Sequence, residues 1–191
     1  VQYVLQKNHF NNDISLRKSK IVEKYINQVD SQKTIFTENE IESFSIKPLI
    51  SPTDEINLAF MLFNYYKERS INLLEHQKSL IELVENEEDL NGTEIVYKNR
   101  EDLDRFKSYS QIKTYQQNLA LSELISIYLK ENDLTKAKEK IIKRLNNRKK
   151  SLNRISSDEI FSLYINSYTD FYDPHQCLIR LIPLIFFSHL L

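Results

Sequence analysis

The stretch that decides the fold is residues 54–85, DEINLAFMLFNYYKERSINLLEHQKSLIELVE. It contains no glycine and no proline, the two residues that most often interrupt a helix. Its apolar residues recur at helical spacing, and they include Ile56, Phe60, Phe63, Ile71, Leu74, Leu80 and Leu83. We therefore expect one long helix from Asp54 to about Glu85, which would be the longest element of the protein.

Helical periodicity continues on both sides of this stretch. Residues 15–30, SLRKSKIVEKYINQVD, place Leu16, Ile21, Tyr25 and Val29 on one helix side and charges on the other. Two further helices are expected over residues 105–130 and 133–150. No run long enough to require a strand alternates between apolar and polar residues.

The helix ends are marked by local signals. Thr37–Glu40 and Ser156–Glu159 have the spacing of a capping box, so a helix is expected to begin at each pair. Pro48 and Pro52 interrupt the pattern and predict a loop before the long helix. Gly92, the single glycine, lies in an acidic stretch and predicts a connection.

The composition supports an all-helical chain. Among 191 residues there are one glycine and four prolines, a scarcity that favours long helices over hairpins. The expected fold class is therefore all-α, an irregular multi-helix domain with one long central helix. The formal net charge is -1, so no global field predicts a nucleic-acid or acidic ligand. Cys177, the one cysteine, excludes an internal disulfide.

Two Ser-x-x-Lys pairs are candidates for an activated serine: Ser15–Lys18 and Ser110–Lys113. Neither is accompanied by the other motifs of a serine hydrolase, and chance alone produces such pairs in a chain rich in both residues. We interpret both as coincidental and expect no catalytic residue in this chain.

Metal ligands are equally sparse. His9 and Asp13 stand four residues apart, His76 is isolated, and Asp170, Asp173 and His175 crowd one turn. A third or fourth ligand is missing near each, and Asp173-Pro174-His175 is explained by a turn that ends a helix. No metal and no cofactor are expected.

A basic helix is the strongest charge feature. Residues 136–154 hold nine basic residues and one acidic residue. Ile141, Ile142, Leu145 and Leu152 form an apolar stripe within it, which favours a core helix with a solvated basic face over nucleic-acid binding. The acidic stretch 82–104 is a possible internal partner for that face.

The order of these pieces resembles the tail-specific, or carboxy-terminal processing, serine proteases. Residues 154–175, RISSDEIFSLYINSYTDFYDPH, are similar to the segment that precedes the PDZ module in that family. The matching positions are Asp158, Ile160, Phe161, Leu163, Asn166, Asp173, Pro174 and His175. The basic helix upstream of them is also similar to one in the family.

The beginning of the chain carries a second part of the resemblance. Residues 9–44 are similar to the opening of the family, with its short aspartate- or glutamate-containing helix after a turn. The corresponding positions are His9, Phe10, Tyr25, Asn27, Asp30, Ile41, Glu42 and Phe44. The matches occur in the family's order over residues 1–175.

The resemblance implies the N-terminal helical domain of a periplasmic serine endopeptidase. In that family a PDZ module binds substrate C-termini and a downstream Ser–Lys dyad cleaves them, and neither segment lies in this chain. The implied partners are protein substrates or adaptor proteins, reached through the full-length protease. The chain opens with Val1 and without a signal-peptide pattern, so a fragment is expected. The alternative is a stand-alone helical interaction or scaffold protein.

The last 16 residues differ from everything before them. Residues 176–191, QCLIRLIPLIFFSHLL, are nearly all apolar, and the resemblance stops at His175 in the middle of a family motif. Because a frameshift has this effect, we interpret 1–175 as the helical domain and 176–191 as an out-of-frame or non-native tail. A membrane anchor is the alternative, but this stretch is shorter than the ~20 residues that span a bilayer.

Overall fold

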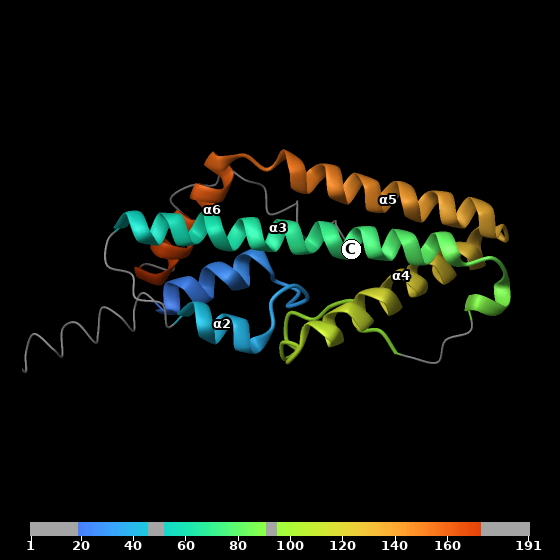
Figure 1. Ribbon diagram of the computed structural model, residues 1–191, viewed down its shortest axis with the longest axis horizontal. Helices are drawn as coiled ribbons and strands as arrows, with labels where there is room; N and C mark the ends of the chain where they lie inside the picture. Colours follow the sequence, from blue (N-terminus) through green and yellow to red (C-terminus); the bar gives the residue numbers. More distant parts are fainter. Residues whose placement is uncertain (1–18, 46–51, 91–94, 173–191) are drawn as a thin grey trace, which may run out of the picture.

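The computed structural model describes residues 19–45, 52–90 and 95–172, and all secondary structure in these residues is helical (Figure 1). The expected all-α fold is therefore confirmed. Leu16, Pro48 and Gly92, on which three of the sequence predictions rest, lie outside the described residues. No helix of the described part is both long and apolar enough to cross a membrane.

The central helix is α3, Pro52–Leu83, which has 32 residues and is the longest element. The expected long helix is confirmed, with bounds displaced by two residues at each end. Pro52 is the first residue of α3 rather than part of the preceding loop, so that detail of the prediction is wrong. Proline suits this position because the first helical N–H has no partner within the helix and the ring fixes φ at a helical value.

The N-terminal helices begin with residues 19–29, which are helical, and continue with α2, Glu38–Ser45. The expected capping box precedes α2. The Glu40 carboxylate accepts a hydrogen bond from the Thr37 amide at 2.8 Å, and the Glu40 amide donates to the Thr37 hydroxyl at 3.4 Å. These two bonds satisfy donors that the first turn of a helix leaves open.

The second half of the chain forms an antiparallel pair, α4 (Tyr109–Glu131) and α5 (Leu134–Arg154), followed by α6 (Ser157–Tyr172). A 3₁₀ turn, η1 (Glu87–Leu90), follows α3. Asn132, in the left-handed conformation with φ 51°, and Asp133, which caps α5, make the tight turn between α4 and α5. Both expected helices are confirmed, and the Ser156–Glu159 capping box is present at the start of α6.

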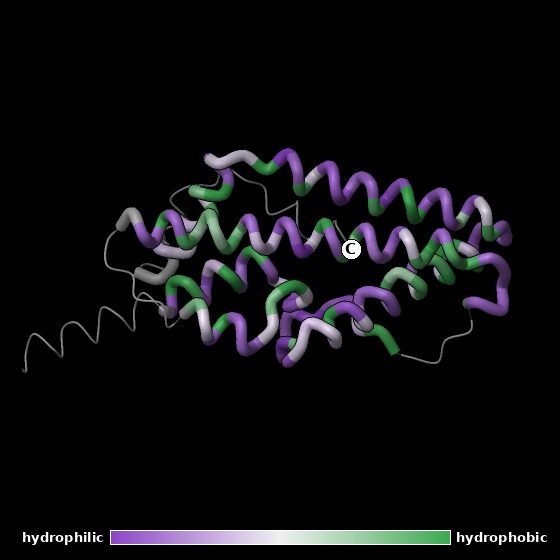
Figure 2. The backbone as a smooth tube through the Cα atoms, viewed as in Figure 1, coloured by the Kyte–Doolittle hydropathy of each residue, from purple (hydrophilic) through white to green (hydrophobic). Residues whose placement is uncertain are grey.

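Two hydrophobic clusters lie along α3. The first joins the N-terminal half of α3 to residues 21–41 and to α6, and includes Tyr25, Phe36 and Phe63. The second joins the C-terminal end of α3 to α4 and α5, and includes Ile81 and Ile141. In Figure 1, α5 and α4 flank the C-terminal half of α3, whereas α2 and α6 lie near its N-terminal half. The tube in Figure 2 shows the corresponding green segments on α3 and α4.

The buried face of α3 includes polar residues that the apolar periodicity does not show. Its buried apolar residues are Leu58, Ala59, Leu62, Phe63, Tyr66, Leu73 and Ile81, with Ser70 and Gln77 among them. Along α3, Ser70 falls within the first cluster, between Tyr66 and Leu73, and Gln77 falls between Leu73 and Ile81 of the second cluster. By contrast Leu83, one of the expected apolar positions, is 75% exposed, because it lies two residues after buried Ile81 and therefore on the opposite side of the helix.

Candidate functional site

Asp30 belongs to the most buried ion pair among the described residues. It follows the helical residues 19–29, its side chain is 2% exposed, and Arg105 donates to it across 2.6 Å. Its two oxygens also accept the amides of Thr34, Ile35 and Phe36 at 2.9 to 3.1 Å. Burial raises the pKa of Asp30, and Arg105 and the amides limit that rise because they favour the carboxylate.

This contact fastens the loop 30–37 to the segment 95–108, about seventy residues further along the chain. Lys33 donates from its Nζ to the carbonyl of Leu103 at 2.9 Å, and the Arg100 amide donates to the Gln32 side chain at 2.9 Å. A backbone hydrogen bond of 3.1 Å runs from the amide of Glu38 to the carbonyl of Phe106. The segment 95–108 is thus held against residues 30–38 through contacts of its residues 100–106.

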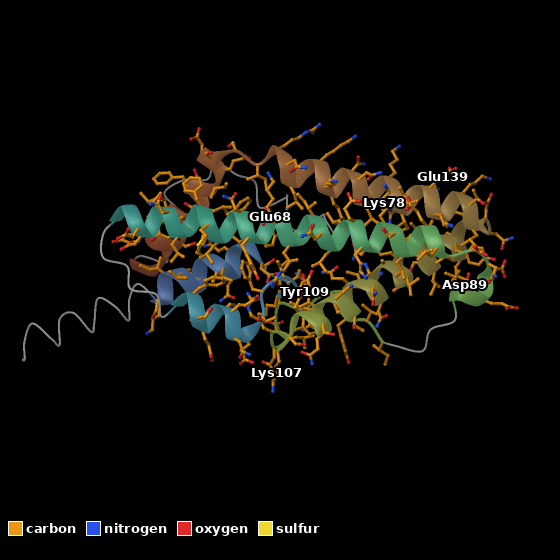
Figure 3. All side chains as sticks on the ribbon, in the orientation of Figure 1. Glu68, Lys78, Asp89, Lys107, Tyr109 and Glu139 are labelled. Carbon is orange, nitrogen blue, oxygen red and sulfur yellow. The ribbon has the colours of Figure 1, made fainter. Side chains whose placement is uncertain are left out.

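Arg69 on α3 forms a second polar node beside the first. It binds Glu40 through both guanidinium nitrogens at 2.7 and 2.8 Å, and it also donates to the Ile35 carbonyl. Its guanidinium lies 4.5 Å from the ring centroids of Tyr65 and Tyr109, and Tyr109 is labelled at the start of α4 in Figure 3. Arg69 thereby joins α2, α3 and α4.

The pKa of Glu40 reflects these contacts. Burial alone would raise it, but hydrogen bonds from Arg69, the Thr37 amide and the Tyr65 hydroxyl lower the pKa of Glu40 to about 2. Conversely, burial and the hydrogen bond to Glu40 raise the pKa of Tyr65 to about 12. Glu40 is therefore a carboxylate and Tyr65 a neutral phenol at neutral pH, so both act as fixed structural groups.

A cavity of about 130 Å³ lies where the two hydrophobic clusters meet. Its walls come from residues 29–35, α3, α4 and α5, and its polar lining includes Tyr66, Ser70, Gln77, Gln116 and Arg148. A cavity of this size has room for several water molecules. Many of its polar groups already have protein partners, as when Gln77 donates to the carbonyl and side chain of Gln116 at 2.9 and 2.8 Å.

Of the two Ser-x-x-Lys candidates, the structure describes Ser110–Lys113, which lies on the protein surface. Ser110 and Lys113 are both exposed on the first turns of α4. Ser15 and Lys18 lie outside the described residues. Among the described residues, no hydrogen bond joins the Ser110 hydroxyl to a basic side chain, the contact by which a serine is activated.

The metal-ligand candidates are not assembled in the described part of the chain, which contains no group of three or more His, Cys, Asp or Glu residues able to hold an ion. His76 instead makes a 2.6 Å hydrogen bond with Gln117, which links α3 to α4. Burial and nearby Lys113 lower its pKa. The pair His9–Asp13 and the motif Asp173-Pro174-His175 lie outside the described residues, and the same holds for the tail 176–191.

The inward stripe of the basic helix is where the sequence predicted it. Ile141, Leu145 and Leu152 are buried, and Ile142 is half-buried against the second cluster. The internal partners of the basic side chains, however, are mostly not in the acidic stretch 82–104. They are Glu75 with Lys149, Glu123 with Arg148, Glu131 with Lys140 and Asp133 with Lys136.

Lys138 is the exception, and it contacts that stretch through the backbone. Its Nζ donates to the carbonyls of Glu82 and Val84 at 3.1 and 2.6 Å. A cation is favourable at this place because the last carbonyls of a helix lack partners and carry partial negative charge.

The described residues that carried the family resemblance divide between core and surface. Tyr25, Asp30, Ile41 and Ile160 are buried, so these positions hold the fold together. Glu42 and Asp158 are exposed. Sequence reasoning missed Arg69 and Arg105, whose partners are distant in the chain. The sequence did contain one signal for Arg69: a basic residue on a mostly apolar face of a helix indicates a buried acidic partner.

Comparison with known proteins identifies the family of this chain. A family model described as the tail specific protease N-terminal domain matches residues 1–176. A tail-specific protease of Haemophilus influenzae is 23% identical over 158 residues, which cover 82% of this chain and 23% of that protein. The chain thus spans about a quarter of the length of this relative. Since the family model covers nearly the whole chain, this protein belongs to the tail-specific protease N-terminal domain family.

Proposed function

We propose that this chain is the non-catalytic helical domain of a periplasmic carboxy-terminal processing serine endopeptidase. The observation that carries the proposal is the match of residues 1–176 to a domain defined as the N-terminal part of tail-specific proteases. In this role the domain supports the PDZ and protease parts of the full-length enzyme and docks protein substrates or adaptors. The same match favours this function over a stand-alone scaffold protein.

The polar contacts described above suit a supporting role. Asp30–Arg105 and Glu40–Arg69 join segments that are 75 and 29 residues apart in the chain. Such buried or half-buried ion pairs fix the relative placement of elements because their geometry is satisfied in one arrangement. A domain held in this way presents its outer surfaces at constant positions, which docking requires.

The test uses the Haemophilus influenzae tail-specific protease, from which the aligned N-terminal part is deleted or replaced by residues 1–175 of this chain. We expect the deletion to spare cleavage of a short peptide, because the chemistry lies elsewhere. We expect kcat/KM for a whole-protein substrate to fall about tenfold or more, because docking no longer raises the local substrate concentration. Replacement by this chain should restore it.

Each part of the proposal has its own contradicting result. If protein cleavage survives the deletion unchanged, the domain has no docking role. If the purified chain alone cleaves unfolded protein, and Ser110→Ala or Ser15→Ala abolishes that activity, the domain is catalytic. The peptide substrate is the internal control, since its cleavage reports an intact catalytic part in every variant.

A further inference from the structure

We propose that the outer face of α5 is a docking surface for an acidic helix of a partner protein. This inference deepens the proposed docking role and rests on it. It begins with the separation of charge in this chain. Helix α5 holds nine basic residues and one acidic residue, whereas the remainder of the chain holds 17 basic and 26 acidic residues. A chain of net charge -1 therefore carries +8 on one helix and -9 elsewhere.

Five of the basic residues form a stripe on one side of α5, which we call the cationic stripe: Lys136, Lys140, Lys143, Lys150 and Arg154. Their spacings of four, three, seven and four residues keep them within one face of a helix. All five are exposed, and they lie opposite the buried residues Ala137, Ile141, Leu145 and Leu152. In Figure 3, nitrogen-tipped side chains project from α5 away from α3.

The partners of these side chains leave much of the charge uncompensated. Lys136 and Lys140 pair with Asp133 and Glu131 at the start of the helix and are still 67% and 52% exposed. Lys143, Lys150 and Arg154 have no acidic partner among the described residues. Of the other four basic residues of α5, Lys138, Arg148 and Lys149 bind back to residues of α3, α4 or the end of α3 and hold the helix in place, and Arg144 is exposed.

The chemistry of the stripe identifies the kind of partner. The exposed face contains no aromatic and no large apolar side chain; its other exposed residues are Thr135, Glu139, Arg144, Asn147 and Asn153. Single-stranded nucleic acids are held by stacking on aromatic rings, and amphipathic helices bind lipid through a buried apolar face. A face of cations and amides without either feature suits the carboxylates of a protein.

The geometry favours a helical partner. From Lys136 to Arg154 the stripe runs about 27 Å, or five helical turns, in a straight line. Acidic residues spaced by three, four and seven positions on a second helix would present carboxylates at the intervals of the stripe, about 5–6 Å for the shorter spacings and about 10 Å for the longer one. Two such helices packed side by side would pair each cation with a carboxylate.

The experiment measures binding of a labelled synthetic helical peptide, about five turns long, that carries glutamate along one face. The full chain is compared with a stripe variant, K143E/K150E/R154E, and with a control variant, K20E/K107E/K113E. The three control lysines are exposed outside α5, so both variants undergo the same change of net charge. Among the described residues, the substituted stripe residues have no acidic partner to lose, and circular dichroism verifies that both variants fold.

We expect the patterned peptide to bind the chain, and its affinity to fall about tenfold or more in the stripe variant and by much less in the control. A scrambled peptide of the same composition, with glutamates around the whole helix, should bind more weakly. The proposal is overturned by absent binding, by equal losses in the two variants, or by equal binding of the scrambled peptide. Tighter binding to phosphatidylglycerol vesicles or to duplex DNA would equally assign the stripe to a different partner.

The two proposals fail separately. If deletion of the domain lowers protein cleavage as expected but the peptide does not bind, only the proposal for the α5 surface is ruled out, and docking must use another face. A positive peptide result with unchanged protein cleavage after deletion would keep the surface and remove the docking role in proteolysis.

Discussion

At the scale of single residues, two arginines determine how distant parts of this domain meet. Arg105 reaches Asp30, and Arg69 reaches Glu40, in each case across tens of residues of sequence. The two sites differ in burial, since the Asp30 side chain is 2% exposed and that of Glu40 is 26% exposed. Breaking the two ion pairs should therefore lower the free energy of unfolding by different amounts.

Replacing Arg105 with alanine should lower the free energy of unfolding by about 3–5 kcal/mol, because the buried carboxylate of Asp30 loses its charge partner. Urea unfolding followed by circular dichroism measures the change. Arg144→Ala is the matched control: this arginine is exposed on α5 and should change stability by about 0.5 kcal/mol at most. A loss below about 1 kcal/mol for Arg105→Ala would show that the backbone amides alone stabilise Asp30.

Glu40 makes part of the stability depend on acid pH. Its pKa is about 2 in the folded domain against a usual 4.5, so the folded state favours the carboxylate. The stability it contributes is fully present above pH 4.5 and is lost as the pH falls from there towards 2. Glu40→Gln should cost about 1–3 kcal/mol at neutral pH and progressively less in acid.

Unfolding of the wild type and Glu40→Gln in urea at a series of pH values measures this convergence. Glu42→Gln, on the exposed side of the same helix, is the control and should match the wild type throughout. A stability difference for Glu40→Gln that stays constant down to about pH 3 would contradict the assigned pKa.

At the scale of elements, capping residues close in sequence determine where a helix begins, whereas distant contacts determine which of its faces is buried. Ser108 caps α4 by accepting the Gln111 amide at 3.3 Å, and the Gln111 side chain accepts the Ser108 amide at 3.2 Å. This reciprocal pair places the start of α4 at Tyr109, four residues after the position expected from periodicity. Residues 105–108 are not helical, and Arg105 and Phe106 among them contact Asp30 and Glu38.

Removal of this cap gives an element-scale prediction. Ser108→Ala should lower the free energy of unfolding by about 1 kcal/mol, because the Gln111 amide loses its acceptor. Ser110→Ala, two residues further on an exposed position, should leave stability within about 0.5 kcal/mol of the wild type. Thermal unfolding followed at 222 nm, the usual helix signal, compares the three proteins; equal midpoints for all would mean that the cap is energetically silent.

At the scale of the whole molecule, α3 makes one body out of two hydrophobic clusters. It supplies Phe63 to the first cluster and Ile81 to the second, and α4, α5 and α6 all pack against it. Its 32 residues form a rod about 48 Å long that cannot unfold at one end without exposing the packed side chains of its neighbours.

The two clusters should consequently unfold together. Phe63→Ala in the first cluster should cost about 3–5 kcal/mol, and Ile141→Ala in the second about 2–5 kcal/mol. Each should move a single transition, seen at the same midpoint by circular dichroism and by tyrosine fluorescence. Two separate transitions, of which each substitution moves one, would show that the polar cavity at the junction uncouples the clusters.

The sequence by itself determined the helices of this domain and the family to which it belongs. Capping boxes at Thr37 and Ser156 act within one turn, and the apolar stripe of α5 follows from spacing alone, so both are readable without tertiary contacts. Tertiary structure alone decided which face of α3 is buried, which acids pair with the basic helix, and how Arg105 meets Asp30. These contacts depend on the placement of segments far apart in the chain, and a local pattern contains no information about that placement.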